Sequence, residues 1–444
     1  MSSAVAVWIA NSAHAESINS ALAAAYNHNS TLNAQRAATR AADELLPQAK
    51  SGYRPTIYGD ANFGFARTTS NVTGNSSLNP YGFGVTIDQS IFDGFRTLNN
   101  VGIAESSIRG SRETLRRVEQ VVLQNGASAY ADVLASIEIV AIRQKNLAFL
   151  AEQLRSSQAR LEVGEGTRTD VAQSEARYSE AQATLEVAKA ELAANRARYL
   201  QVIGRSPNSL SWPRGPVALY PRSLNEAQRI GLNEHPAVLL TRYGVDAAAY
   251  VVKLQEGGYL PNLTLRGNAN QRYNNGTTGS SNSSASATLN LAVPLYQGGR
   301  VSSQVREAKQ LLSQARIQVD EARDQVRADI TSAWHALESA RLNVIANQAS
   351  LRAARLALEG VIEERNVGQR TQLDVLNSQS DVLFAEENLV NNRRIQVIAG
   401  YALVASMGRL NSQRLGLAVR HYYPRDHYEA VKDLWIGLRT PSGR

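Results

Sequence analysis

The sequence contains two successive copies of one structural unit, and this duplication restricts the possible folds more than any other feature. Residues 163–176 read VGEGTRTDVAQSEA, and residues 367–380 read VGQRTQLDVLNSQS. Upstream of each phrase, IFDGFR at 91–96 corresponds to LYQGGR at 295–300. Because the matches occur in the same order and at nearly constant separation, the sequence predicts a tandem repeat.

Each copy also begins in the same way. Helix-type periodicity covers residues 17–50 and 223–256, and the first serine of each stretch can serve as an N-cap. His28 of the first stretch corresponds to His235 of the second. The duplication therefore extends over nearly the whole chain.

This pattern predicts four segments of sequence. Residues 1–15 form the remnant of an export signal, and residues 409–444 form a C-terminal extension outside the duplication. The first repeat, 16–215, contains a half-length helix, a β-hairpin at 56–92, a long helix at 97–163 and a helix at 169–204. The second repeat, 216–408, contains a half-length helix, a β-hairpin at 262–296, a long helix at 300–366 and a helix at 373–408.

The second long helix has the apolar spacing of a coiled coil. Its seam steps by four and three residues, with one 4-4 stutter at 322–330, through Val301, Val305, Ala308, Leu312, Ala315, Val319, Ala322, Val326, Ile330, Ala333, Leu337, Ala340 and Val344. A helix of this length spans roughly 100 Å, and the shorter helices span roughly half of that. We therefore expect two short helices, stacked end to end, to pair with each long one, with the VG phrase as the turn at the far end.

The strand-like segments alternate between apolar and polar residues. In 285–295 the positions Ala285, Leu289 and Leu291 alternate with Ser286, Thr288 and Asn290. Strands of ten to twelve residues with this pattern are typical of transmembrane β-barrels. A soluble sandwich with one wet face is the alternative, but the chain has only four such strands beside very long helices. The Asn/Ser/Gly-rich stretches 70–80 and 274–284 are expected to be the external loops.

Four strands cannot close a barrel, because even small barrels need about eight. Open strand edges in lipid would leave backbone groups without hydrogen-bond partners. The chain is therefore expected to oligomerise, and two, three or four copies would supply eight, twelve or sixteen strands. No segment has the roughly 18 consecutive apolar residues that a membrane-spanning helix needs.

The N-terminus and the composition indicate an envelope protein. Residues 4–10 are apolar and Ala13-His14-Ala15 is a signal-peptidase pattern, although the usual basic residues before the apolar run are missing. The mature chain would begin at Glu16, and the absence of cysteine fits an oxidising compartment. The net charge of +8 is carried by arginines interleaved with acidic residues, so a nucleic-acid partner is not expected.

These features together resemble the TolC family of outer-membrane channel-tunnel proteins. The most specific segments are PLYQGGR at 294–300, GYLP at 258–261 and VGQRTQLDVLNSQ at 367–379. The resemblance implies an α+β fold in which a tandem-duplicated long-helix coiled-coil tunnel carries four transmembrane β-strands per chain, closing a barrel as a homotrimer. It also implies residence in the bacterial outer membrane, in contact with its lipid, with the tunnel in the periplasm.

The resemblance assigns roles to the turns at the periplasmic end. Thr169 and Asp170 match a pair that holds the family's tunnel closed, and Arg370 matches an arginine that bridges to the first turn. Asp374 matches an aspartate whose three copies form an acidic ring at the aperture, where a multivalent cation can bind. The first VG phrase, which contains Gly164, resembles the first of these turns, and Gly368 belongs to the second VG phrase.

Two positions depart from the family pattern. Asn377 stands where a second aspartate is found, and Arg365 stands where a tyrosine is found. We expect a weaker cation block from one acidic ring, and an electrostatic pairing of Arg365 with Asp170. The alternative is purely local: Arg370 and Asp374 would form an i,i+4 pair, and Gly164 and Gly368 would only be turn residues.

The expected function is an exit duct for drug efflux or type I protein secretion, coupled to an inner-membrane transporter and a periplasmic adaptor. No nucleophile–base pair, metal-ligand cluster or phosphate-binding loop is present in the sequence, so an enzyme, a cofactor and a metal are not expected. The alternatives are a non-conducting protein that spaces or tethers the two membranes, and a soluble periplasmic adaptor. In the C-terminal extension, His421 and His427 are expected on the surface, and the extension itself is a candidate belt around the helices.

Overall fold

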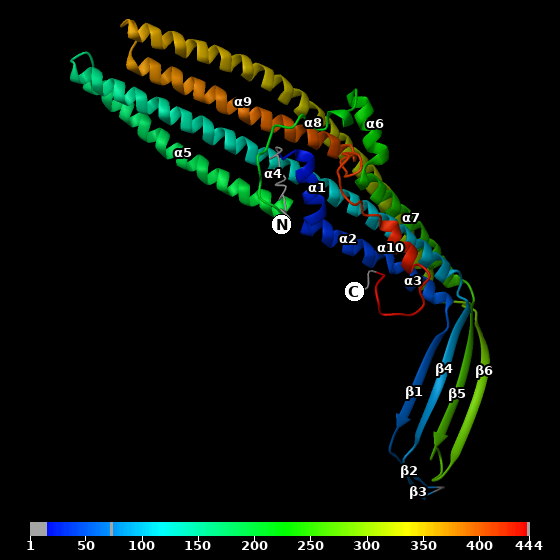
Figure 1. Ribbon diagram of the computed structural model, residues 1–444. Helices are drawn as coiled ribbons and strands as arrows, with labels where there is room; N and C mark the ends of the chain where they lie inside the picture. The colour runs from blue at the N-terminus through cyan, green and yellow to red at the C-terminus, as the bar shows by residue number, and fades with distance from the viewer. Residues whose placement is uncertain (1–15, 72–73, 442–444) are drawn as a thin grey trace, which may run out of the picture. The chain divides into compact units, whose positions relative to one another are not determined.

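The computed structural model describes residues 16–71 and 74–441 (Figure 1). The expected export signal therefore lies outside the described residues. The described part divides into two compact units. The helical unit contains residues 16–35, 114–238 and 323–422. The strand unit contains residues 36–113, 239–322 and 423–441.

Helices make up most of the described chain. They are α1 (Ile18–His28), α2 (Ser30–Asp43), α3 (Leu45–Lys50), α4 (Arg96–Glu162), α5 (Arg168–Ile203), α6 (Leu224–Glu234), α7 (Pro236–Glu256), α8 (Arg300–Asn366), α9 (Gln372–Ser406) and α10 (Pro424–Val431), with short 3-10 turns at Ser51–Tyr53, Val217–Leu219 and Gly257–Tyr259. The long helices α4 and α8 each contain 67 residues and lie within one residue of the expected bounds. No helix in the described residues is long and apolar enough to cross a membrane.

The half-length helices, each expected as one continuous helix, are interrupted. In the first half the break lies at Asn29, whose side-chain oxygen accepts hydrogen bonds from the backbone N–H groups of Thr31 and Leu32, at 3.0 and 3.2 Å. In the second half α7 begins at Pro236, which has no N–H to donate to a preceding helical turn. Each expected stretch is therefore at least two helices joined at a sharp break.

These breaks are joints where short helices meet in the helical unit. A Cβ at Gly204, the C-cap of α5, would lie 3.0 Å from the Cβ of His28. A Cβ at Gly408, just beyond α9, would lie 2.6 Å from the Cα of His235. Both glycines have positive φ, +87° and +78°. The end of each short helix thus meets the break in its half-length helix, as the expected end-to-end stacking requires.

The expected coiled-coil seam of α8 is buried or half-buried along its length. At its far end Val344 and Leu351 pack against Val382, Ala385 and Leu389 of α9. In the other helix pair, Val140 of α4 packs against Leu185 and Ala188 of α5. These narrow apolar contacts hold α4 to α5 and α8 to α9. The two helices of each pair run alongside each other in Figure 1.

The strand unit contains a four-stranded antiparallel sheet of order β1-β4-β5-β6, formed by β1 (Thr56–Phe63), β4 (Tyr81–Phe92), β5 (Asn262–Tyr273) and β6 (Ser281–Ala292). The four expected strands are present. The stretch 70–80 is not only a loop, however, because β2 (Ala66–Ser70) and β3 (Gly74–Leu78) pair in a separate two-stranded sheet. This pairing, in which Thr68 lies opposite Ser76, extends the hairpin of β1 and β4 beyond the main sheet.

The C-terminal extension packs on the strand unit through α10. His427 Nδ1 lies 3.0 Å from a carboxylate oxygen of the fully buried Asp43, and the Arg112 guanidinium lies over the Tyr428 ring at 4.9 Å. Burial raises the pKa of Asp43. The expectation of a surface position was wrong for His427, whose side chain is only 12% exposed, because a buried carboxylate on α2 provides it with a partner.

Candidate functional site: the two helix–helix turns

The first long helix ends at Gly164 through a hydrogen-bonded stop. Gly164 has φ +81°, and its N–H donates to the carbonyl of Leu161 at 3.1 Å. The N–H of Glu165 donates to the carbonyl of Arg160 at 2.8 Å. This pair of bonds is the Schellman motif, in which a left-handed residue lets the chain turn back and satisfies the last carbonyls of the helix.

The second long helix ends in the same way at Gly368. This residue has φ +79°, and its N–H donates to the carbonyl of Arg365 at 3.0 Å. The N–H of Gln369 donates to the carbonyl of Glu364 at 2.8 Å. The two glycines of the repeated phrase therefore have one shared structural role.

The aspartate of each phrase belongs to a capping box that starts the next helix. The Thr167 hydroxyl accepts from the Asp170 N–H at 3.1 Å, and the Asp170 carboxylate accepts from the Thr167 N–H at 3.1 Å. In the second turn the Thr371 hydroxyl accepts from the Asp374 N–H at 3.2 Å, and the Asp374 carboxylate accepts from the Thr371 N–H at 2.9 Å. The T-x-x-D spacing is a sequence signal for this capping role, which was not among the roles expected for these aspartates.

The second turn carries a carboxylate with an altered acidity. Hydrogen bonds from the backbone and the side chain of Thr371, together with the nearby Arg370 guanidinium, hold the pKa of Asp374 below its usual range. Asp374 therefore remains charged in weakly acidic solution. Asn377, one helical turn further along α9, is exposed and adds no charge.

The contacts of Arg370 and Asp170 stay within their own turns. Arg370 Nε lies 2.8 Å from Glu364, in a pair whose side chains are each about half exposed. Asp170 bonds to Thr167, and Thr169 is exposed. Within the chain, the described bonds therefore do not link these residues across the two turns.

Arg365 provides the link that joins the two halves near the turns. Its Nη1 donates to the side-chain oxygens of Gln153 on α4 at 2.9 Å and Gln372 on α9 at 2.8 Å. Gln372 Nε2 also donates to Gln153, at 3.3 Å. The expected pairing of Arg365 with Asp170 is not among these contacts. Burial, and then the charge of Arg160, lower the pKa of Arg365.

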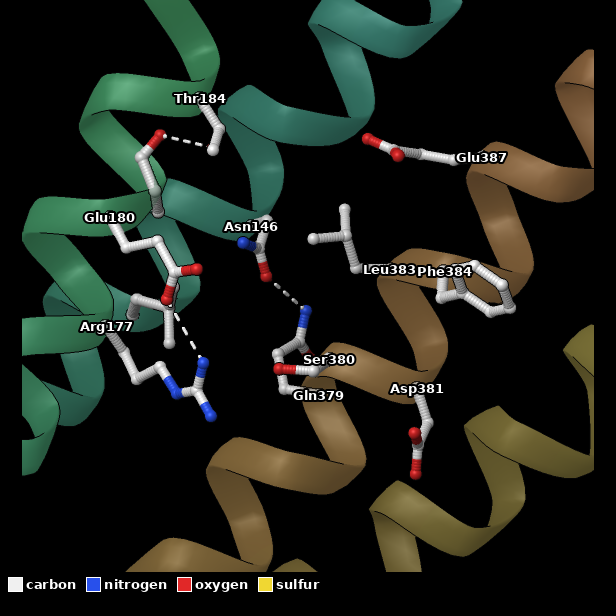
Figure 2. Close-up of a pocket in the computed structure, with 12 residues that line it drawn as sticks. Asn146, Arg177, Glu180, Thr184, Gln379, Ser380, Asp381, Leu383, Phe384 and Glu387 are labelled. Atoms are coloured by element: carbon white, nitrogen blue, oxygen red, sulfur yellow. Dashed lines mark hydrogen bonds and ion pairs between the residues drawn. The ribbon is translucent and has the colours of Figure 1, made fainter.

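A groove of about 430 Å³ lies between α5 and α9, with α4 at its floor. Figure 2 shows Asn146 and Gln379 pointing toward each other there, and they are joined by a 2.8 Å hydrogen bond. The rim carries charged groups from both sides, including the Arg177–Glu180 pair. Phe384 is 68% exposed at the edge. Sequence reasoning did not identify this groove, because its residues come from three distant segments.

Metal-binding clusters are absent from the described residues, where no three His, Cys, Asp or Glu side chains are placed to hold an ion. Each turn is held by a Schellman motif and a capping box, and Arg365 links the two halves of the chain beside the turns.

Comparisons with known proteins agree on one family. The family model described as outer membrane efflux protein matches residues 21–205 and 230–409. The outer membrane efflux protein BepC of Brucella suis is 45% identical over 430 residues, covering 97% of this chain and 93% of its own. The outer membrane protein TolC of Escherichia coli is 25% identical over 413 residues, covering 87% of this chain and 81% of its own.

Solved structures share the fold at low sequence identity. The Campylobacter jejuni CmeC outer membrane channel matches with a TM-score of 0.78 and 16% identity, covering 94% of this chain and 89% of its own. CusC matches with a TM-score of 0.76 and 14% identity, covering 88% of this chain and 91% of its own. Both likenesses show that this chain shares the fold of these structures.

Proposed function

Because this chain belongs to the outer membrane efflux protein family and acts as an outer-membrane efflux or secretion duct, we propose that three copies assemble into one channel. In this proposal the three four-stranded sheets close a twelve-stranded barrel in the lipid. The duplicated helices form a tunnel in the periplasm that ends at the paired turns. Each chain contributes two repeats, at 16–215 and 216–408, and the region 409–444 is an addition to them.

The open sheet is the observation that carries this proposal. In the order β1-β4-β5-β6, both β1 and β6 have a partner in the main sheet on one side only. Apolar side chains such as Phe83, Val85 and Leu289 are 47–61% exposed on these strands. If neighbouring copies pair edge to edge, the backbone groups of β1 and β6 gain hydrogen-bond partners. If the outer face contacts lipid, the exposed apolar side chains lie in an apolar environment.

The turns are the proposed gate. Arg365, Gln153 and Gln372 are the latch within each protomer, because they connect both halves beside the turns. Three copies of Asp374 around a threefold axis would line the aperture with negative charge. Thr169, Asp170 and Arg370 are proposed to contact neighbouring protomers, since their described bonds within one chain are local and their side chains remain partly exposed.

We propose that the duct has no enzymatic activity of its own and needs no cofactor. An inner-membrane transporter supplies the energy, and a periplasmic adaptor connects the two. The α5–α9 groove suits a helical segment of the adaptor, because it combines the exposed Phe384 with a charged rim. The cargo is a small molecule or a secreted polypeptide, chosen by the transporter.

Mass and conductance test the assembly. The purified protein in detergent should have the mass of three chains, and it should conduct ions in planar bilayers. A stable monomer would contradict the proposed barrel. A trimer that inserts without conducting would favour the alternative of a spacer between the membranes. Extraction without detergent would favour a soluble adaptor. Drug susceptibility and the secreted protein profile of a deletion strain would identify the cargo.

A further inference from the structure

We propose that residues 434–438, which follow α10 in the C-terminal extension, lie in the headgroup region of the outer membrane's inner phospholipid leaflet. This inference rests on the proposed function, which places the strands in the membrane. It assigns the extension a lipid-binding role at the foot of the barrel. The strands and this segment both belong to the strand unit.

The segment is tied to the chain just before the first strand. Lys50 Nζ lies 2.7 Å from the Asp433 carboxylate and donates to the carbonyl of Lys432 at 3.1 Å. Arg54 Nη1 donates to the carbonyl of Leu434 at 2.8 Å, and its guanidinium lies over the Trp435 ring at 4.5 Å. Because β1 begins at residue 56, these bonds hold the extension at the end of the sheet.

The same level of the strand unit carries a set of exposed aromatic residues. One lies at each of the four places where a helix meets a strand of the main sheet: Tyr53, Phe95, Tyr259 and Tyr296, which are 53%, 54%, 50% and 89% exposed. Transmembrane barrels carry aromatic girdles at the membrane–water interface, where the rings sit among the headgroups. Trp435, held beside Arg54, extends this girdle.

The residues that follow are apolar and almost completely exposed. Trp435 is 68% exposed, Ile436 is 91% exposed and Leu438 is 103% exposed. The Arg54 guanidinium lies over the Trp435 ring, and Arg439 directly follows Leu438 in the chain. A phospholipid surface satisfies both features, because apolar side chains enter the acyl boundary while cationic groups remain beside the phosphates. Continuity with the aromatic girdle favours lipid over a second copy of the chain as the occupant.

Fluorescence quenching in vesicles tests this placement. In the variant Trp212→Phe/Trp334→Phe, Trp435 is the only tryptophan of the chain after Glu16. The protein is reconstituted into phosphatidylcholine/phosphatidylglycerol vesicles with bromine at a shallow or a deep acyl position. Trp435 should be quenched by shallow bromine more than by deep bromine and should be protected from aqueous acrylamide. Ile436→Asp/Leu438→Asp in the same background should abolish the lipid quenching.

The matched control retains Trp334 and replaces Trp212 and Trp435. Trp334 lies 34 residues after the start of α8, roughly 50 Å along the helix, so bromolipid should not quench it. If Trp435 is open to acrylamide and not quenched by lipid, the segment lies in water and the proposal is wrong. Protection from both quenchers would assign it to a neighbouring protomer, which also overturns the proposal. Failure of the protein to enter vesicles or conduct would instead contradict the proposed function.

Discussion

The two halves of the chain reverse direction with the same glycine stop and capping box, but the side chains around the two turns make different contacts. Gly164 and Gly368 have nearly equal positive φ, and the same capping box follows each of them. Only the second turn has Arg365 beside it, which connects that turn to α4 of the first half. Duplication therefore preserved the signal that reverses the chain, while divergence beside the turn made one copy the point of attachment.

The joints of the half-length helices differ in a similar way. His28 and His235 occupy corresponding joints, and a helix-ending glycine packs against each. His28 Nδ1 lies 3.1 Å from the carbonyl of Ala24, whereas His235 Nδ1 accepts from the N–H of Ala237 at 3.2 Å. A ring nitrogen that accepts a hydrogen bond must be unprotonated, so the second joint is sensitive to acid.

The largest effect is expected from the His235 joint. Burial is the main cause that lowers the pKa of His235 to about 4. Between that value and the ordinary 6.5, the unfolded chain binds more protons at this position than the folded chain. Stability should therefore fall as the pH falls from 6.5 to 4, by about 3 kcal/mol. His235→Asn keeps an acceptor and should remove this dependence, measured by the thermal midpoint in detergent against pH.

His28→Asn is the control for that experiment, because it removes a histidine from the corresponding joint and leaves His235 in place. The pH dependence should persist in this variant. If His235→Asn retains the full pH dependence, another group causes it and the two joints are equivalent.

The next effect concerns the link between the halves. Gln153→Ala removes one acceptor of Arg365 and of Gln372, which should destabilise the closed turns by about 2 kcal/mol and favour opening roughly thirtyfold. Single-channel conductance and uptake of large antibiotics should both increase. Gln379→Ala is the matched control, because it breaks another glutamine bond between α9 and α4, farther from the turn. Equal conductance in the two variants would show that Arg365 is not a latch.

A smaller effect is expected from the glycines that the two turns share. Gly164→Ala and Gly368→Ala should each destabilise the helical unit by about 1 kcal/mol, because a side chain disfavours the left-handed conformation. Nothing lies within 4 Å of a Cβ at either position, so backbone strain should be the only cause. Thermal unfolding of both variants checks this. Clearly unequal losses would mean that one glycine has a role beyond the turn.

The smallest effect is expected at the proposed aperture, where Asp374 and Asp170 should differ in their effect on cation block. Asp374→Ala should remove a weak block by trivalent cations, and Asn377→Asp should strengthen it by adding a second ring of charge. Because the pKa of Asp374 is lowered, the wild-type block should persist as the pH falls to the ordinary range of aspartate. Asp170→Ala, which changes the corresponding capping residue, is the control: whatever it does to the unblocked current, the fraction blocked by the trivalent cation should stay as in wild type. Equal block in wild type and Asp374→Ala would place the aperture elsewhere.

Much of this architecture could be predicted from the sequence because its signals are local. A glycine followed by T-x-x-D, a seam at heptad spacing and a strict alternation of apolar residues each act within a few residues of the chain. They fixed the paired long helices, the turns and the four strands of the main sheet. The capping role of Asp170 and Asp374 was equally local and was available in the same phrase.

Only the tertiary structure decided which distant side chains meet. Nothing in the sequence near Arg365 indicates Gln153, which is 212 positions earlier, and no pattern near His427 indicates the buried Asp43. The α5–α9 groove and the attachment of Trp435 to Arg54 have the same origin. Long helices touch along narrow seams, so a single arginine or histidine finds its partner through the register in which those helices pack. That register depends on the sum of many weak apolar contacts, and no short stretch of sequence contains it.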